Sequence, residues 1–262
     1  MKLRNMSLRA AALAGLPALV IAGLPTAGHA AAGGAVELVS GGAALVYVAA
    51  PGATNSASVT TFNGETAVFD TAPLTAGNGC RQLGPRAVAC GTGVRGFTAT
   101  LGDMDDVFSV GVPIPGFVDG GAGDDTLIAG TRSASPRALT FVGGTGVDTV
   151  SYKGSDLSVR VSLNNVADDG RNIDSDDIRS DVENIVGSTL GGDILVGNSG
   201  KNVLDADAGP GDRLIGLGGP DLLLAKDLAQ DTELNCGDGA GDEVVMDTVD
   251  PTPAGCELVR KF

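Results

Sequence analysis

The chain has 262 residues and a formal net charge of −15, with 32 acidic residues against 17 basic ones. It contains 41 glycines and no tryptophan, so we do not expect a core centred on aromatic side chains. The negative charge makes nucleic acid and anionic membranes poor partners.

The N-terminal segment has the pattern of an export signal. Three basic residues among the first nine precede an apolar stretch at 10–24 and a small-residue cleavage site at 28–30. We therefore expect residues 1–30 to be a signal peptide and the remainder to be secreted into the extracellular space. No later apolar run is long enough to span a bilayer, so membrane insertion is not expected.

The single histidine, His29, lies inside this segment. The mature chain would therefore lack Ser-His-Asp and Cys-His catalysis, histidine-ligated zinc and histidine general bases. No nucleophile motif such as GxSxG is present either. We accordingly expect a protein that is not an enzyme.

Residues 31–100 alternate short Val, Thr and Leu runs with Gly, Asn and Pro turns. The runs at 44–48, 58–62 and 66–69 are typical of strands. No window shows an apolar period of 3.6 residues with caps at both ends, which indicates little helix. We therefore predict an all-β fold and interpret residues 31–100 as an N-terminal β region that begins or caps it.

The four cysteines form two pairs that are local in sequence, Cys80 with Cys90 and Cys236 with Cys256. Four cysteines allow three connectivities, and neither spacing matches a CxxC zinc site. Export favours two local disulfides, with buried free thiols or a four-thiolate metal site as the alternatives.

Beyond residue 100, acidic or amide residues recur, each with a large apolar residue two positions later. These anchors are Asp106, Asp125, Asp148, Asp193, Asn202, Asp212, Asp221 and Asp242. Because side chains alternate between the two faces of a strand, we expect the apolar residues to stack in the core.

Two segments, 120–127 and 143–150, both read GGxGxDxU, where U is a large apolar residue. The motif resembles the hemolysin-type calcium-binding repeat, or RTX, family, and partial copies extend the resemblance over about residues 100–247. It implies a parallel β-roll, a β-solenoid of degenerate nonapeptides, with calcium held between glycine-rich turns. We expect residues 101–247 to form this roll and residues 248–262 to cap it, with a disulfide at each end.

Calcium prefers six to eight oxygen ligands, and a short glycine turn supplies them as backbone carbonyls beside a carboxylate. The resemblance therefore implies roughly one to four calcium ions between the turns. The residues that it assigns to metal binding are Asp106, Gly121, Gly123, Asp125, Gly144, Gly146, Asp148, Asp193, Asp212 and Asp221.

In the family, partner carboxylates lie two nonapeptides apart, which is about 18 residues. Three pairs are separated by 19 residues: Asp106 with Asp125, Asp193 with Asp212, and Asn202 with Asp221. Asp125 and Asp148 are 23 residues apart, and we expect residues 131–137 to loop out so that the register is kept.

An acidic run at 168–177 invites comparison with an EF-hand, with Gly170 as its sixth residue. That register places Ala167 at the third position and Asp176 at the twelfth, where a bidentate Glu is expected. We interpret the run as a solvated loop.

The sequence thus predicts a secreted, noncatalytic calcium-binding protein. One alternative is a calcium-assisted β-helix polysaccharide lyase or hydrolase, with Lys153 or Arg160 as the candidate base. Another is a cell-surface adhesion or matrix module with a cell-wall or glycan partner. A metal-free solenoid, in which the glycines serve only the turns and the aspartates are solvated, is the remaining alternative. The export signal departs from the family, whose toxins and proteases usually lack one.

Overall fold

The computed structural model describes residues 33–130 and 135–262. The predicted signal peptide therefore lies outside the described residues, as do positions 131–134 of the predicted loop. The described residues contain no α-helix, only a short 3-10 turn, η1 (Ser40–Gly42), so the all-β prediction is confirmed. None of them belongs to a helix long and apolar enough to cross a membrane.

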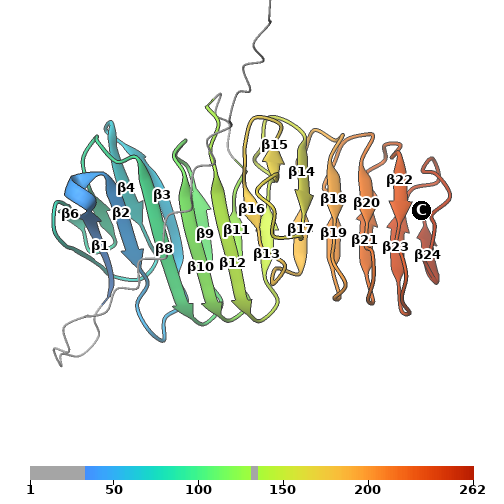
Figure 1. Ribbon diagram of the computed structural model, residues 1–262, viewed down its shortest axis with the longest axis horizontal. Helices are drawn as coiled ribbons and strands as arrows, with labels where there is room; N and C mark the ends of the chain where they lie inside the picture. The colour runs from blue at the N-terminus through green and yellow to red at the C-terminus, as the bar shows by residue number, and fades with distance from the viewer. Residues whose placement is uncertain (1–32, 131–134) are drawn as a thin grey trace, which may run out of the picture. The chain divides into compact units, whose positions relative to one another are not determined.

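Within the described ranges the strands form three sheets (Figure 1). The first runs in the order β16 (Asp177–Ile178), β12 (Leu139–Thr145), β10 (Gly116–Ala122), β8 (Gly96–Asp103), β2 (Ala44–Val48), β1 (Gly34–Val39) and β5 (Leu74–Ala76). The second runs in the order β24 (Leu258–Lys261), β23 (Glu243–Met246), β21 (Leu222–Ala225), β19 (Val203–Asp205), β17 (Asn184–Val186), β13 (Thr149–Ser151), β11 (Thr126–Ile128), β9 (Val107–Val110), β3 (Ser56–Phe62), β4 (Glu65–Phe69), β7 (Ala87–Ala89) and β6 (Arg81–Gly84). The third runs in the order β15 (Gly170–Arg171), β14 (Val159–Ser162), β18 (Ile194–Val196), β20 (Arg213–Ile215) and β22 (Glu233–Asn235).

From β8 to β13, and again from β17 to β23, the chain alternates between the second sheet and one other sheet. Strands β8, β10 and β12 pair in parallel in the first sheet, while the intervening β9, β11 and β13 pair in parallel in the second. Strands β18, β20 and β22 alternate in the same way with β19, β21 and β23. Figure 1 shows these strands following one another in chain order along the sheets.

The register survives the long interval between Asp125 and Asp148. Leu127 lies opposite Phe108 on one side and Val150 on the other, so β11 aligns with both neighbours. The extra residues therefore do not shift the strands, as the sequence predicts.

The N-terminal region is built differently, mainly from antiparallel pairs, although β1 pairs in parallel with β5. Strands β1 and β2 pair antiparallel, as do β3 with β4, β4 with β7, and β6 with β7. Strand β2 coincides with the predicted run at 44–48, while β3 and β4 contain the runs at 58–62 and 66–69. Parallel pairing of β2 with β8 and of β3 with β9 joins this region to the alternating strands.

The apolar residues two positions after each anchor are fully buried, which confirms their predicted stacking. They are Phe108, Leu127, Val150, Leu195, Leu204, Leu214, Leu223 and Val244. Burying one such side chain contributes about 1.5–3 kcal/mol, so this ladder is a major part of the core.

Both local disulfides are present, Cys80–Cys90 and Cys236–Cys256. The first joins the residue before β6 to the residue after β7, and the second joins the residue after β22 to a residue shortly before β24. Each ties one end of the strand array together.

Candidate metal site

Side chains that precede the strands of the second sheet form one continuous feature, which we call the first row. Its members are Asn55, Asp106, Asp125, Asp148, Glu183, Asn202, Asp221, Asp242 and Glu257. The backbone N–H of Asp106 donates to Oδ1 of Asp125 at 2.9 Å, and that of Asp125 donates to Oδ1 of Asp148 at 2.8 Å. The same bond recurs along the row, apart from the step between Glu183 and Asn202. Apart from that of Asn55, each side chain therefore fastens one turn to its neighbour.

A second row accompanies the third sheet and consists of Asp193, Asp212, Asp231 and Asp250. The N–H of each of the first three donates to Oδ1 of the next, at 2.7, 3.0 and 2.9 Å, and every step spans 19 residues. Asp231 and Asp250 are not among the residues predicted from the sequence, although the interval of 19 residues, continued from Asp193, leads to both.

The structure divides the predicted carboxylates between these rows. Asp106, Asp125, Asp148 and Asp221 lie in the first row, whereas Asp193 and Asp212 lie in the second. All three pairs predicted from the 19-residue spacing are neighbours within a row.

One oxygen of most of these buried carboxylates has no hydrogen-bond partner among the described residues. These are the Oδ2 atoms of Asp106, Asp125, Asp148, Asp212, Asp221, Asp231 and Asp242. Leaving a buried polar atom unpaired costs about 1–3 kcal/mol, and more when it is charged. The rows therefore call for a proton or a cation at Oδ2.

Burial raises the pKa of several row members. The pKa of Asp106 and that of Asp148 rise to about 6, and those of Asp212 and Asp231 rise to about 7, mainly because burial disfavours the charged form. The pKa of Asp125 is raised by the same cause, and the charged groups that act on it are other carboxylates. Among the described residues, the charged groups that act most strongly on these five carboxylates are therefore other acidic side chains.

Glycine keeps space free around these oxygens. A Cβ at Gly120 would collide both with Oδ2 of Asp125 and with the carbonyl oxygen of Gly143 in the next turn. At Gly146, where φ is 143°, a Cβ would collide with the carbonyl oxygen of Gly123. The GGxGxD glycines thus allow successive turns to stack closely, a packing role that needs no metal.

The two motif copies are in register. Gly121 lies opposite Gly144 in the pairing of β10 with β12, and both have positive φ, 102° and 105°. Gly123 and Gly146 follow at φ values of 132° and 143°. The structure therefore brings the four predicted glycines and the carboxylates of Asp125 and Asp148 into adjacent turns.

The donor set around these turns consists of oxygen atoms. The described residues contain no group of three or more His, Cys, Asp or Glu side chains placed to hold a metal. An ion at the first row would therefore draw most ligands from backbone carbonyls and water, beside one or two carboxylates. That set fits calcium, which takes oxygen ligands, and does not fit zinc.

Some row members are satisfied without a metal. Asp193 accepts the backbone N–H of Val159 and the hydroxyl of Ser188 at Oδ1, and the N–H of Ser188 at Oδ2. Asn202 accepts the N–H of Asn198 and donates through Nδ2 to a carbonyl. The segment from Asp106 to Asp148 is the better candidate site, because it combines three successive carboxylates that have an unpartnered Oδ2 with both complete GGxGxD turns.

The acidic run at 168–177 is not a solvated loop, and that prediction is wrong for its central residues. Asp169 and Asp176 are 1% and 0% exposed, and the side chain of Asp174 is fully buried. Asp169 accepts the backbone N–H of Ser162 at 2.7 Å and that of Ile178 at 2.9 Å. Its carboxylate thus fixes the backbone of the run.

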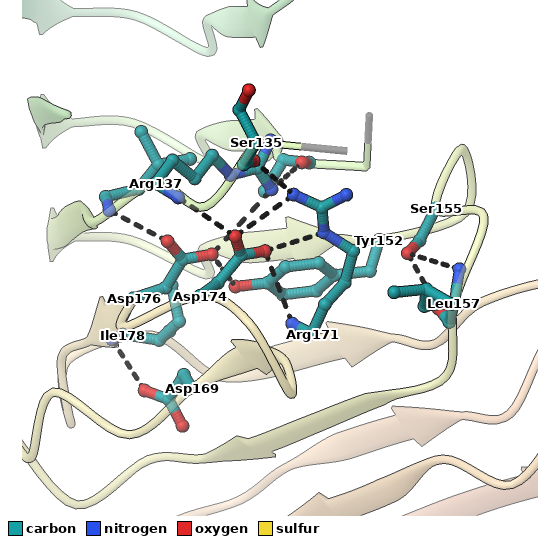
Figure 2. Close-up of polar contacts among 12 residues, drawn as sticks. Ser135, Arg137, Tyr152, Ser155, Leu157, Asp169, Arg171, Asp174, Asp176 and Ile178 are labelled. Atoms are coloured by element: carbon teal, nitrogen blue, oxygen red, sulfur yellow. Dashed lines mark hydrogen bonds and ion pairs between the residues drawn. The ribbon is translucent and has the colours of Figure 1, made fainter. Parts of the chain in front are cut away.

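Two buried arginines explain why this acidic run can be buried. Figure 2 shows Arg171 and Arg137 pointing toward Asp174 and Asp176. Arg171 donates to both oxygens of Asp174, at 2.8 and 3.0 Å, and Arg137 Nη2 lies 3.7 Å from Oδ2 of Asp176. The Tyr152 hydroxyl donates to that same oxygen at 2.9 Å. This run therefore forms an ion-pair network that supports the fold.

Lys153, the candidate base of the enzymatic alternative, is exposed and ion-paired. Its Nζ lies 2.6 Å from Oδ1 of Asp207, and this hydrogen bond raises the pKa of Lys153. A general base at neutral pH needs a lowered lysine pKa. The geometry therefore gives no support to Lys153 as a base.

Comparison with known proteins adds no family: no family model matches the chain, and no curated protein matches it.

Proposed function

We propose that the protein is a secreted, noncatalytic calcium-binding protein whose alternating parallel strands form an RTX-type β-roll. The observation that carries the proposal is the unpartnered, buried Oδ2 of Asp106, Asp125 and Asp148. A calcium ion supplies the missing positive charge and accepts the carbonyl oxygens that glycine turns expose. Secretion rests on the export signal in the sequence.

The best-supported site lies between the two complete GGxGxD turns. Asp125 and Asp148 would supply carboxylate oxygens, and the glycines of residues 120–123 and 143–146 would supply carbonyls. When bound, calcium would cancel two negative charges and link adjacent turns. Its binding free energy would then also be folding free energy. Affinities of extracellular calcium modules, about 10⁻⁴ to 10⁻³ M, set the expected range.

Calcium titration by calorimetry, with circular dichroism in parallel, tests this proposal on the exported chain with its disulfides intact. The test variant is Asp125→Asn plus Asp148→Asn. Its matched control is Asp105→Asn plus Asp124→Asn, which removes the same charge from exposed neighbours. Magnesium serves as the ion control.

We expect saturable calcium binding in the wild-type chain and the control variant, and at least about tenfold weaker binding in the test variant. No calcium-specific heat in the wild type, or equal binding by the test variant, would refute the proposal.

A further inference from the structure

Strand β24 ends the second sheet and leaves one edge open. It pairs with β23 on one side, and none of the described residues pairs with its outer side. Val259 occupies the position of Val244 in the adjacent strand, yet Val259 is 44% exposed and Val244 is fully buried. The row of apolar core side chains therefore continues into β24, where Val259 is exposed to solvent.

The open edge offers backbone hydrogen-bonding groups. The N–H groups of Leu258 and Phe262 donate to the carbonyls of Asp242 and Met246, at 3.0 and 3.1 Å. In a parallel pair, alternate residues direct their N–H and C=O groups to opposite sides of the strand. Those of Val259 therefore face the open edge, together with those of Lys261, two residues further on. Such an edge is a template for an added strand.

The corresponding end of the third sheet is covered. Ala254 bridges to Asn235 beside β22, accepting the N–H of Cys236 at 2.9 Å and donating to the carbonyl of Leu234 at 3.0 Å. Pro253 precedes Ala254 and has no N–H to offer to a further strand. The fold thus closes one edge with a proline-containing segment and leaves β24 open.

The exposed edge is basic and apolar in an acidic protein. Arg260 forms an ion pair with Glu243, whereas none of the ion pairs among the described residues includes Lys261. Lys226 lies 3.8 Å from the ring centroid of Phe262, which is 59% exposed. Cations gathered here, in a chain of net charge −15, favour a partner that carries carboxylates.

We propose that the open edge of β24 binds an extended, carboxylate-bearing segment of a protein partner by strand addition. The outer N–H and C=O groups of Val259 and Lys261 pair with its backbone, Val259 contacts its apolar side chains, and Lys261 pairs with its carboxylates. A second copy of the chain is a poorer occupant. If the β24 edges of two copies paired, Arg260 and Lys261 of one copy would lie near those of the other. If β24 paired with β6, at the opposite edge of the same sheet, they would lie near Arg81.

Fluorescence anisotropy with two labelled peptides tests the proposal on the full exported chain in calcium buffer. The probe alternates valine with aspartate or glutamate, and its control carries lysine at the acidic positions. Lys261→Glu reverses the charge of the edge, and Val259→Pro removes an outward N–H without touching the bonds to β23. Arg86→Glu, an exposed position far from β24 in the strand order, is the matched charge control.

We expect the acidic peptide to bind at least tenfold more tightly than the basic one, with an affinity that falls as salt is added. Lys261→Glu should abolish this preference, Val259→Pro should abolish binding, and Arg86→Glu should change neither. Equal binding of the two peptides, no binding, or indifference to Lys261→Glu would overturn the proposal. A concentration-dependent dimer that Lys261→Glu or Val259→Pro dissociates would replace the acidic partner with a second copy. If Val259→Pro does not fold, the exposed Lys261→Glu variant still decides.

Discussion

Aspartate and asparagine occupy equivalent positions in the first row, but they differ in whether all of their polar atoms have hydrogen-bond partners. Asn202 satisfies both ends of its amide with protein groups. Asp125 uses one oxygen to hold Asp106 and leaves the other buried and unpaired. The carboxylate therefore carries a charge that the protein itself does not balance. Replacing Asp125 by Asn tests the effect of this charge.

Asp125→Asn should have opposite effects with and without calcium. Near neutral pH without calcium, it removes an unbalanced buried charge and keeps the acceptor for Asp106, so the melting temperature should rise by about 2–4 °C. In calcium, the variant should lose part of the stabilisation that the wild type gains. Thermal unfolding by circular dichroism measures both, with exposed Asp124→Asn as control. A lower melting temperature of the variant without calcium, together with the same rise in calcium as the wild type, would contradict this account.

Gly146→Ala should destabilise the protein by about 1–3 kcal/mol. The new Cβ would meet the carbonyl oxygen of Gly123, and the backbone is held at a positive φ of 143°. Urea unfolding measures the free-energy change. Gly93→Ala, where a Cβ meets nothing within 4 Å and φ is not positive, should be nearly neutral. Similar losses at both positions would show that close stacking of the turns is not the cause.

Individual residues also show which features could be predicted from the sequence and which could not. The repeat placed Leu127 and Val150 in the core because period and alternation are local properties. It did not reveal that Asp176 is buried, because its ion-pair partner Arg137 lies 39 positions earlier in the chain and only folding brings the two side chains near each other. Local patterns thus predict which residues face inward, and long-range ion pairs escape them.

At the scale of elements, the disulfide Cys236–Cys256 links the end of β22 to the segment that leads into β24. The double variant Cys236→Ser plus Cys256→Ser should release a loop of about 20 residues, which costs about 3 kcal/mol. Hydrogen exchange should rise first in β24 and the residues around Ala254. Exchange that rises evenly along all strands would contradict this local role. The matched variant, Cys80→Ser plus Cys90→Ser, should instead affect β6 and β7.

The repeat predicted some of the pairings between elements but not others. The spacing of 19 residues predicted the pairs Asp193–Asp212 and Asp106–Asp125, and both are neighbours. It did not predict the antiparallel pairing of β1 with β2 and of β3 with β4, because residues 31–100 carry no repeat. Turn residues signalled strands there, but the partners of those strands depend on tertiary contacts.

For the whole molecule, the raised carboxyl pKa values predict a stability that depends on pH. The ordinary Asp pKa is about 3.9, and the pKa of Asp212 and that of Asp231 are about 7 in the folded chain. Between these values the folded state holds more protons than the unfolded state. Stability without calcium should therefore be greatest near about pH 4 and fall as the pH rises toward about 7.

Urea unfolding across this pH range in chelator measures the trend. Asp212→Asn plus Asp231→Asn should make this fall in stability smaller, because these two groups no longer take up protons on folding, while Asp106 and Asp148 still do. A stability that rises from pH 4 to 7 without calcium would contradict the buried, unbalanced rows.

The most direct test of the central claim is the melting temperature of a chain of residues 31–262, with both disulfides formed, near neutral pH, in chelator, in millimolar calcium and in millimolar magnesium. If calcium balances the carboxylate rows, calcium should raise the melting temperature by several degrees, and the rise should continue as calcium increases beyond its dissociation constant. Magnesium, which demands a tighter octahedral geometry, should do much less. Identical melting temperatures in chelator and in calcium would contradict the account and leave the rows as metal-free, partly protonated supports of the fold.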